Sequence, residues 1–479
     1  MQASMINNLS RQSEPFNEDL IFYREKDSIL THITEICKGM EVIKNITFLG
    51  ATVEEDETKI TSWGAVDIEK SRLSEVTVQF KIQVKDEEEI IERKFFIPRL
   101  VDNFFFILND VKYFPIYQVV EATVFLSSKI YSLKTLLMPI RFKYKKRTFS
   151  DFIGEELTAT EFNLNLFKHN ISFLYYFFAE KGFEETLEFF GYEYGEEGDF
   201  FIKELTEKQV SGYSEDYYCF KLKKKNFLLA NKESLQCTTD IDFLYALVNI
   251  LTSNNKINEP IEVWKKLLGS TFSPTSIHEE KAESILFSLR RIFDNFTKRV
   301  LKIDEEDKKD IYTILRWMIV NFEELRYIDT MDLCNKRIQC WEYLTAPLLR
   351  YFSNSTYRIL NTRNLAMKDL RSIFNINANF LIKRIKNNDL IRYNGAVNNI
   401  DLFSAGLKVT FRGPGSIGDG SDVADKFRDI HKSYIGRISL ITTSAGDPGL
   451  STTIVPFTSI KAGRFEPRPF VPSDNNVEE

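Results

Sequence analysis

The glycine-rich stretch at residues 398–460 constrains the fold more than any other part of the chain, because it holds eight of the 20 glycines. Two runs of β-prone residues, 407–412 and 437–442, are predicted strands on either side of a loop. Glycine reaches positive φ angles and proline fixes φ, so the chain is expected to turn sharply after Arg412. Such a loop often carries function, although an ordinary glycine-rich hairpin has the same composition. The residues that define the loop are Gly413, Pro414, Gly415, Gly418 and Gly420.

The spacing of Gly413, Gly415 and Gly418 also matches the G-x-G-x-x-G pattern of dinucleotide-binding folds. That pattern requires a helix that begins at the third glycine and packs on a parallel sheet. Here the third glycine is followed by the polar residues 419–422, which favour a loop. A stand-alone nucleotide-binding enzyme that uses residues 413–418 is therefore one alternative function.

The distribution of charge is uneven along the chain. The 479 residues suffice for about three domains, and 43% hydrophobic with 28% charged residues is typical of a soluble globular protein. Net charge is only −6, but residues 326–392 carry twelve Lys and Arg against five Asp and Glu, whereas residues 183–200 carry seven acids and no base. This pattern is typical of one face that meets phosphate, although a solvated helical surface has the same composition.

Cysteine and histidine give no sign of a metal site. The five cysteines form no C-x-x-C pair, and the four histidines show no ligand spacing with them. Neither a zinc site nor a disulfide framework is expected, which fits a reducing compartment. The first 16 residues are polar and the apolar stretches are short, so neither a signal peptide nor a membrane span is expected.

The spacing of apolar residues predicts the secondary structure of several segments. Residues 21–40 have helical periodicity, with Ile29, Ile33 and Ile36 on one face. Residues 75–84 alternate as a strand, and an acidic turn leads into a second strand at 90–98. Further helices are predicted at residues 161–180, 183–190 and 279–300.

Three runs occur in a fixed order around the Gly413 loop. They are Gly413-Pro414-Gly415, then Phe427-Arg428-Asp429-Ile430-His431, then Tyr434-Ile435-Gly436-Arg437. This order resembles the fork region of the β subunit of multi-subunit RNA polymerases, where a Gly-Pro-Gly turn precedes an Arg-Asp-(Val/Ile)-His run and a Tyr-Gly-Arg run. The chain departs from the family at residues 442–446, which lack the two acids that the family has there.

Two further segments resemble the same subunit. Ile97-Pro98 followed by Asn109 is similar to the hairpin of the family's protrusion domain, although the family's Glu-Arg pair is Lys112-Tyr113 here. Residues 329–338 resemble the D-x-D-x-x-G-N-(R/K)-R segment and the amphipathic helix after it. Asn335, Lys336 and Arg337 match this segment, while Cys334 replaces its glycine.

The resemblance implies an α+β, multidomain fold with mixed sheet and helix protrusion and lobe domains and a glycine-rich fork region. Residues 1–126 would form the first part of the protrusion and residues 127–308 the lobe. Residues 309–397 would return to the protrusion with basic helices, and residues 398–479 would form the fork region and an acidic tail.

The resemblance also implies a function, in which the chain forms one wall of the DNA/RNA cleft and the fork near the active site. The family's catalytic Mg²⁺ is held by aspartates of the other large subunit, so no catalytic or metal-binding residue is expected here. Cations around the fork would hold the phosphates of the template and transcript. Alternatively, Arg428 and Arg437 would pair with Asp425 and Asp429 and only brace the loop. The predicted nucleic-acid contacts are Lys336, Arg337, Lys408, Arg412, Arg428 and Arg437.

The sequence passes into an acidic tail soon after the fork, whereas a cellular β subunit continues for hundreds of residues. In this respect it resembles the non-virion RNA polymerases of jumbo bacteriophages, in which both large subunits are split. The implied partners are a C-terminal β chain, β′ chains, whether single or split, a promoter-specificity subunit, the DNA template and the RNA transcript, in the cytoplasm of an infected bacterium. A phage structural protein with no nucleic-acid role is the second alternative.

Overall fold

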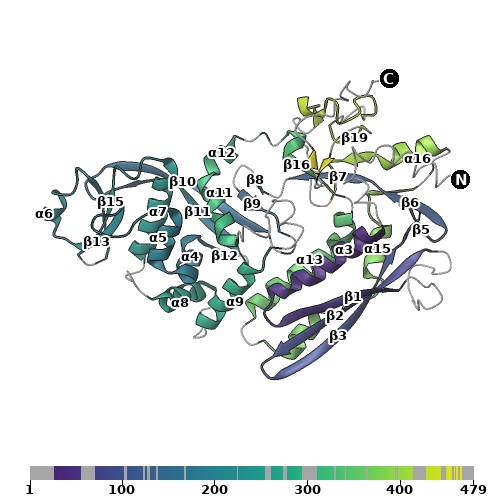
Figure 1. Ribbon diagram of the computed structural model, residues 1–479, viewed down its shortest axis with the longest axis horizontal. Coiled ribbons are helices and arrows are strands. Elements are labelled where there is room, and N and C mark those ends of the chain that lie inside the picture. Colours follow the sequence, from purple (N-terminus) through teal and green to yellow (C-terminus); the bar gives the residue numbers. More distant parts are fainter. Residues whose placement is uncertain are drawn as a thin grey trace, which may run out of the picture.

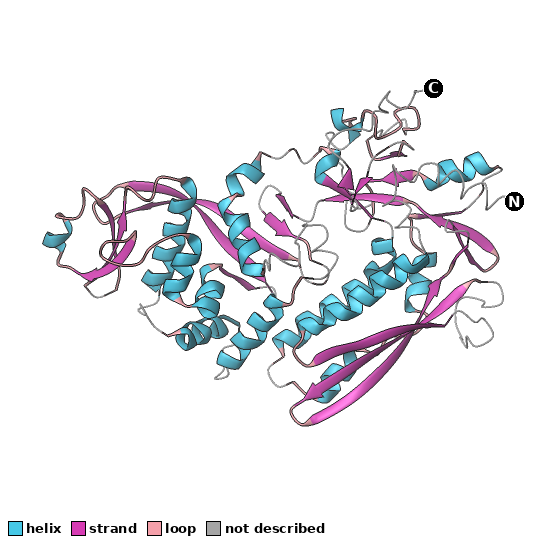
Figure 2. Cartoon of the chain, in the orientation of Figure 1, coloured by secondary structure: helices cyan, strands magenta, loops and turns pink. Residues whose placement is uncertain are grey.

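The computed structural model describes residues 26–465 with internal gaps, the longest of which cover 55–70, 294–309 and 414–427. Within the described residues the chain forms five sheets, around which helices pack in an elongated molecule (Figure 1). Nearly all strand pairs are antiparallel, and helices and strands are interspersed along the chain (Figure 2). The predicted multidomain α+β fold is confirmed.

A long three-stranded antiparallel sheet lies at one end of the molecule, with helices along it (Figure 1). Its middle strand alternates as predicted, because Val76, Val78, Phe80 and Ile82 are all fully buried. The Phe80 ring lies 4.4 Å from the ring of Phe374. The elements are β1 (Ile46–Glu54), β2 (Leu73–Val84), β3 (Glu87–Pro98), α3 (Lys26–Gly39), α13 (Trp341–Asn361), α14 (Met367–Ile373), α15 (Phe380–Lys386) and the 3₁₀ turn η1 (Met40–Val42).

Helices α3 and α13 show why segments far apart in sequence form one unit. Ile29, Ile33 and Ile36 of α3 are buried, as the sequence predicted, and the helix packs against α13. The part of the predicted helix at residues 21–25 lies outside the described residues. On α13, Leu344 and Leu348 are buried one turn apart on the same face.

A four-stranded sheet continues from this module. Its hairpin turns at Asn109 and Asp110, whose φ angles of 52° and 65° are those of a tight hairpin turn. The predicted turn at Asn109 is confirmed. The strands, in order across the sheet, are β17 (Ile391–Tyr393), β6 (Val111–Pro115), β5 (Phe105–Leu108) and β4 (Leu100–Val101).

A five-stranded antiparallel sheet with several helices forms the middle of the molecule (Figure 1). Phe322 packs against Tyr144 and Phe162 at ring distances of 5.0 and 4.9 Å, which holds α12 on this sheet. The strands, in order, are β12 (His169–Ser172), β11 (Glu156–Leu166), β10 (Ile140–Ser150), β9 (Ile130–Leu133) and β8 (Val124–Leu126). The helices are α4 (Leu174–Lys181), α5 (Phe183–Phe190), α7 (Thr238–Ser253), α8 (Ile261–Phe272), α9 (His278–Arg290), α11 (Ile311–Val320) and α12 (Phe322–Arg326).

The prediction of one helix over residues 161–180 is wrong. Phe162, Leu164 and Leu166 are buried while the asparagines between them are partly exposed, which is a period of two and therefore a strand. The helix α4 begins only at Leu174. The helix at residues 183–190 is confirmed, and that at 279–300 is confirmed as far as Arg290, with 294–300 outside the described residues.

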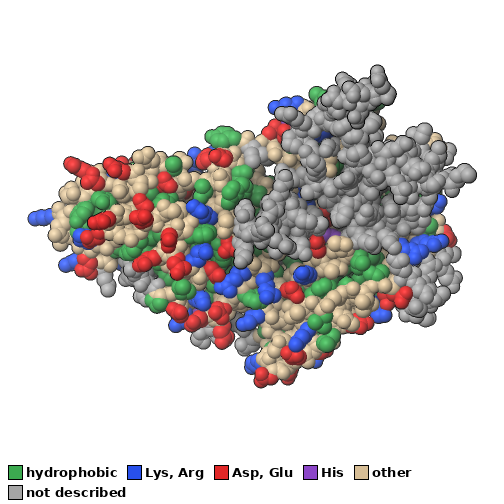
Figure 3. Space-filling model, in the orientation of Figure 1, with side chains coloured by type: hydrophobic (Ala, Val, Ile, Leu, Met, Phe, Trp, Pro, Cys, Tyr) green, Lys and Arg blue, Asp and Glu red, His purple; other side chains and the backbone are tan. Residues whose placement is uncertain are grey.

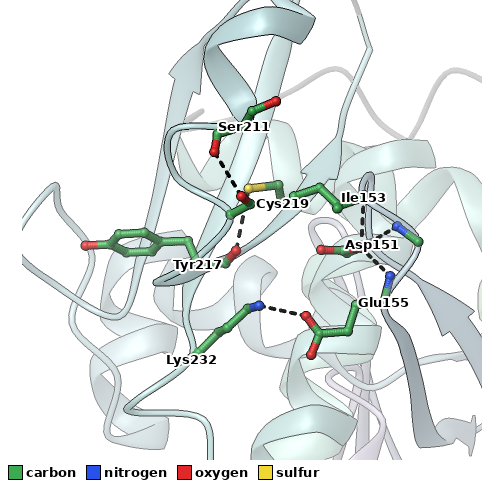
Figure 4. Close-up of polar contacts among 9 residues, drawn as sticks. Asp151, Ile153, Glu155, Ser211, Tyr217, Cys219 and Lys232 are labelled. Carbon is green, nitrogen blue, oxygen red and sulfur yellow. Dashed lines mark hydrogen bonds and ion pairs between the residues drawn. The ribbon is translucent and has the colours of Figure 1, made fainter.

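A small three-stranded sheet caps the outer end of the β10–β11 hairpin. Asp151 accepts hydrogen bonds from the backbone N–H groups of Ile153, Gly154 and Glu155 at 2.8–3.0 Å, which fixes the hairpin turn (Figure 4). Lys232 reaches Glu155 at 2.6 Å and ties the small sheet to that turn. The elements are β13 (Phe200–Glu204), β15 (Asn226–Asn231), β14 (Tyr217–Lys221) and α6 (Glu207–Val210).

A six-stranded sheet, here called the junction sheet, lies on the opposite side of the molecule from the small sheet (Figure 1). Its strands, in order, are β19 (Ser451–Thr453), β18 (Lys408–Thr410), β7 (Tyr117–Glu121), β16 (Lys336–Gln339), β21 (Arg464–Phe465) and β20 (Ile460–Lys461). Beside it lie α16 (Asn399–Gly406) and the 3₁₀ turns η3 (Leu333–Asn335) and η4 (Lys432–Tyr434). The strand predicted at residues 407–412 is confirmed by β18.

The strand predicted at residues 437–442 is wrong. This segment has only an isolated bridge between Ile438 and Ile454 and otherwise consists of turns and bends. Ile438 is buried, whereas Leu440 and Ile441 are both exposed. The apolar residues here therefore do not lie on one buried face, as they would in a half-buried strand.

Candidate nucleic-acid interface

The junction sheet brings together three segments that are far apart in the sequence. Strand β7 follows the Asn109 hairpin, β16 carries Lys336 and Arg337, and β18 leads into Gly413. In the register, Lys336 lies opposite Glu121, and Val409 lies beside Tyr117 in the sheet's parallel pair. Only residues 336–338 of the segments that resemble the β subunit lie in this sheet, where they are flanked by the strand that follows the Asn109 hairpin; the strand that leads into the fork lies on the far side of β7. Sequence spacing alone could not show this arrangement.

A separate apolar core holds the junction sheet together. It is made of side chains from β7, β16, β18 and the segments that follow the Gly413 loop. Since these side chains come from distant parts of the chain, the core fixes the position of the loop relative to β7 and β16. Its members are Tyr117, Val119, Leu333, Ile338, Val409, Phe411, Tyr434, Ile438, Leu450, Ile454, Ile460 and Phe465.

The segment before β16 makes direct polar contacts with the segment at residues 431–437. The backbone N–H of Leu333 donates to the Ser433 hydroxyl at 3.0 Å, and His431 Nε2 lies 3.1 Å from Asp329 Oδ2. A hydrogen bond from the N–H of Met331 lowers the pKa of Asp329, and His431 adds to this effect. The carboxylate of Asp329 thus connects two of the three motif segments.

Three of the six predicted contact residues are buried in the chain. The exposed fractions are 2% for Lys336, 9% for Arg337 and 5% for Arg437. Lys336 Nζ lies 2.7 Å from Glu121 Oε1, and Arg437 Nη1 donates to the carbonyl oxygen of Ser433 at 2.7 Å. These contacts lie within the sheet and the adjacent turn, where long cations serve packing as well as charge.

The other three predicted residues, Lys408, Arg412 and Arg428, are exposed. Main-chain hydrogen bonds bring their segments together at one edge of the sheet. The N–H of Gly449 donates to the carbonyl of Arg428, and the N–H of Phe411 donates to the carbonyl of Leu450, both at 2.8 Å. We call these three exposed cations the edge cations.

Lys432 is a further exposed cation, four residues after Arg428, and the sequence prediction did not include it. It lies in η4, directly after His431. Its position next to the Arg-Asp-Ile-His run was the available signal.

The start of the Gly413 loop is fixed by glycine geometry and by two buried glutamines. Gly413 has φ of 106°, and a Cβ atom there would lie 3.0 Å from Leu390 and 3.2 Å from Gln118 Nε2. Gln118 donates to the carbonyl of Arg412 at 2.9 Å and accepts from Gln339 Nε2 at 2.5 Å. The predicted turn residues Pro414, Gly415, Gly418 and Gly420 lie outside the described residues.

Metal-ligating and nucleophilic side chains do not gather in the described part of the chain. No group of three His, Cys, Asp or Glu side chains there could hold a metal ion. Cys219 is buried next to the Asp151 turn (Figure 4), and burial raises the pKa of its thiol to about 11. Burial likewise raises the pKa of Cys37, so neither thiol is an activated nucleophile.

No described helix is both long and apolar enough to span a bilayer.

Comparison with protein families identifies the chain. No curated protein matches the sequence. A family model described as non-virion RNA polymerase subunit matches residues 2–479. Since this match covers almost the whole chain, the protein belongs to the non-virion RNA polymerase subunit family.

Proposed function

We propose that the chain is the N-terminal β chain of a phage-encoded multi-subunit DNA-dependent RNA polymerase that transcribes phage genes in the host cytoplasm. Membership of the family makes it an RNA polymerase subunit. The finer role is supported by one observation: the junction sheet joins residues 336–338 of one segment that resembles the β subunit to the strand that follows the second segment and to the strand that precedes the third. The chain would form one wall of the DNA/RNA cleft, with the Gly413 loop as a fork near the active site.

The edge cations are the proposed phosphate contacts of this fork. Exposed Arg412 and Arg428 can pair two guanidinium N–H groups with phosphate oxygens, and Lys408 adds a point charge. The buried Lys336, Arg337 and Arg437 instead support the sheet on which the loop stands. This division follows from exposure, because a side chain must reach solvent to contact a phosphate of another molecule.

Catalysis is assigned to the assembled enzyme. We place the Mg²⁺ that supplies nucleotidyl-transfer chemistry on another subunit, and no residue of this chain is proposed as its ligand. The proposed partners are a C-terminal β chain, β′ chains and a promoter-specificity subunit. This chain contributes to catalysis by positioning, since its junction sheet holds the edge cations along the path of the template and the transcript.

The two alternatives have less support. A stand-alone nucleotide-binding enzyme needs a βαβ unit at Gly413. Among the described strands, however, β18 pairs in parallel with β7, which comes from a distant part of the chain, and antiparallel with β19. A structural protein does not account for the family match.

The edge cations are tested in the assembled polymerase by measuring how DNA binding depends on salt. Each phosphate contact that is lost should lower the slope of log affinity against log salt by about one. Arg412→Gln/Arg428→Gln is expected to lower it by about two and to release the template at lower salt. Lys208→Gln, at an exposed lysine on α6, is the control and should leave the slope unchanged. An unchanged slope in the double variant, with normal assembly, would show that the edge cations are structural.

A further inference from the structure

Strand β10 carries a row of cations that lies apart from the junction sheet. Its sequence from Ile140 to Lys145 alternates so that cations point to one face of the hairpin and apolar and aromatic residues to the other, while Lys146 and Phe149 depart from this pattern. Phe142 and Tyr144 lie on the packed face, where Tyr144 contacts Phe322 of α12. The cations of the other face are all exposed, and we call them the β10 stripe: Arg141, Lys143, Lys145 and Arg147.

Little negative charge lies opposite the stripe. In the register with β11, Arg141 and Lys143 face Asn165 and Asn163, and only Lys145 faces a carboxylate, that of Glu161. Glu161 is in turn bound by Arg147 at 2.8 Å. Across the described part of the chain, Arg141, Lys143 and Lys145 make no ion pair. Along the paired residues of β10 and β11, this face therefore carries four positive charges and one negative charge.

The usual structural reason for lysines on a strand explains only part of the stripe. Charged side chains often protect the edge of a sheet from pairing with another chain. In the described strands, β9 pairs with β10 only at residues 140–143, whereas β11 pairs with it as far as Ser150. Arg141 and Lys143 therefore lie between two paired strands, and Lys145 and Arg147 lie where β10 is an edge. Neighbouring like charges on one sheet face also repel each other and reduce stability. Edge protection therefore does not account for Arg141 and Lys143, whose like charges reduce stability unless an anion binds them.

The spacing of the stripe suits a polyanion with regularly placed charges. Alternate residues of a strand lie about 6.6 Å apart on one face, so the four cations span about 20 Å. Flexible side chains at this spacing can each reach a phosphate of a nucleic-acid backbone, with release of its counterions. Acidic side chains instead are frequent at the outer end of the molecule, around α6 and β13 (Figure 3). The cationic row is therefore local and does not follow the charge of its surroundings.

We propose that the β10 stripe binds the phosphate backbone of nucleic acid at a second surface, separate from the edge cations. Family membership favours nucleic acid over an acidic protein, since a polymerase subunit works beside DNA and RNA. The contact would be independent of sequence, because the stripe offers charge and no groups arranged to read bases.

The test uses the assembled polymerase with Lys143→Gln/Lys145→Gln, which leaves the Arg147–Glu161 pair intact. For duplex DNA or for single-stranded nucleic acid, the salt slope of binding is expected to fall by about two, with weaker binding at fixed salt. The two substrates are measured separately to identify which one the stripe contacts. Lys143→Arg/Lys145→Arg keeps the charge and should keep the slope.

The matched control is Lys208→Gln/Lys266→Gln, which removes two exposed lysines from α6 and α8 of the same region. An equal fall in slope in this control would show that the effect comes from the overall charge of the protein, and it would overturn the proposal. An unchanged slope in the stripe variant would also overturn it, and loss of a partner chain without a change in slope would assign the stripe to protein docking. The edge cations are wild type throughout, so failure here leaves the proposed function standing.

Discussion

Replacing Glu121 with leucine is expected to lower the free energy of unfolding by about 3 kcal/mol, the low end for breaking a buried ion pair. Lys336 Nζ lies 2.7 Å from the Glu121 carboxylate, and its side chain is only 3% exposed. Without Glu121 the ammonium would stay buried with no carboxylate and with Lys134 and Arg337 nearby. The low end is expected because Glu121 is 30% exposed and water can enter its place.

Removing the other partner of this ion pair, Lys336, should lower the free energy of unfolding by less. Lys336→Met leaves Glu121 partly in water, and Glu121→Leu/Lys336→Met should recover most of the loss because an apolar pair replaces the ion pair. Chemical denaturation of the three variants measures this order. If Lys336→Met is instead as stable as the wild type but weakens DNA binding by the assembled enzyme, Lys336 is a nucleic-acid contact. Its proposed role in supporting the junction sheet would then be wrong.

The same cluster gives stability a pH dependence. Burial lowers the pKa of Lys134 from 10.5 to about 8, with a further contribution from Arg337 that Glu121 opposes. The unfolded state therefore binds more protons between these two values, and stability is expected to rise as pH increases from 8 to 10. Because Glu121→Leu removes the opposing charge, its loss of stability should be larger at pH 7 than at pH 10. An equal loss at both pH values would exclude this coupling.

Gly413→Ala is expected to destabilise the protein by about 2 to 3 kcal/mol and to lower transcription by the assembled enzyme. A side chain at φ of 106° costs about 1 to 2 kcal/mol in backbone strain. The new Cβ would also press on Gln118 Nε2 at 3.2 Å, and the loss of its hydrogen bond to the Arg412 carbonyl adds about 1 kcal/mol. The loop would then leave the position that the two glutamines give it.

Gly154→Ala is the matched control for this change. Gly154 has φ of 100°, but no atom lies within 4 Å of the position that a Cβ would take there, so the variant experiences strain without the contact. The difference in unfolding free energy between the two variants measures the contact alone. Equal losses, with full transcription by both, would mean that the position of the Gly413 loop does not depend on Gln118.

Local signals in the sequence were sufficient for some elements and were misread for others. The turn at Asn109 was predictable because asparagine tolerates positive φ and follows a strand-like run. Residues 161–166 were predicted as helix although Phe162, Leu164 and Leu166 alternate with polar residues, so their period of two was available. At residues 437–442 apolar content suggested a strand, but Leu440 and Ile441 face solvent.

The arrangement of the site depends on contacts between distant parts of the chain, which no local sequence pattern can predict. Lys336 and Arg337 were predicted to contact nucleic acid, yet both are buried in β16, a central strand of the junction sheet, whose neighbours come from residues 117–121 and 464–465. The Gln118–Gln339 pair joins positions 221 residues apart, so neither glutamine stood out in the sequence. Exposure to solvent, and not residue type, separates the edge cations from the buried cations Lys336, Arg337 and Arg437.

The segment after the Gly413 loop also carries two highly exposed isoleucines. Ile435 and Ile441 are 64% and 95% exposed, although Tyr434 and Ile438 of the same segment are buried. Single exposed aliphatic side chains are common on protein surfaces, but Ile441 is almost fully exposed, and covering it with another chain would remove apolar surface from water. In a subunit of a multi-subunit enzyme, we propose that a partner polymerase chain covers this surface. Reconstitution with Ile441→Asp should therefore be weaker than with Ile90→Asp, a change at an exposed isoleucine of β3.

Reconstitution of RNA synthesis from separately purified chains tests the central claim most directly. We expect no RNA synthesis by this chain alone, none by the partner chains without it, and template-dependent synthesis when all are combined with Mg²⁺. RNA synthesis by the isolated chain, or full synthesis by the partners in its absence, would contradict its role as the N-terminal β chain of the polymerase.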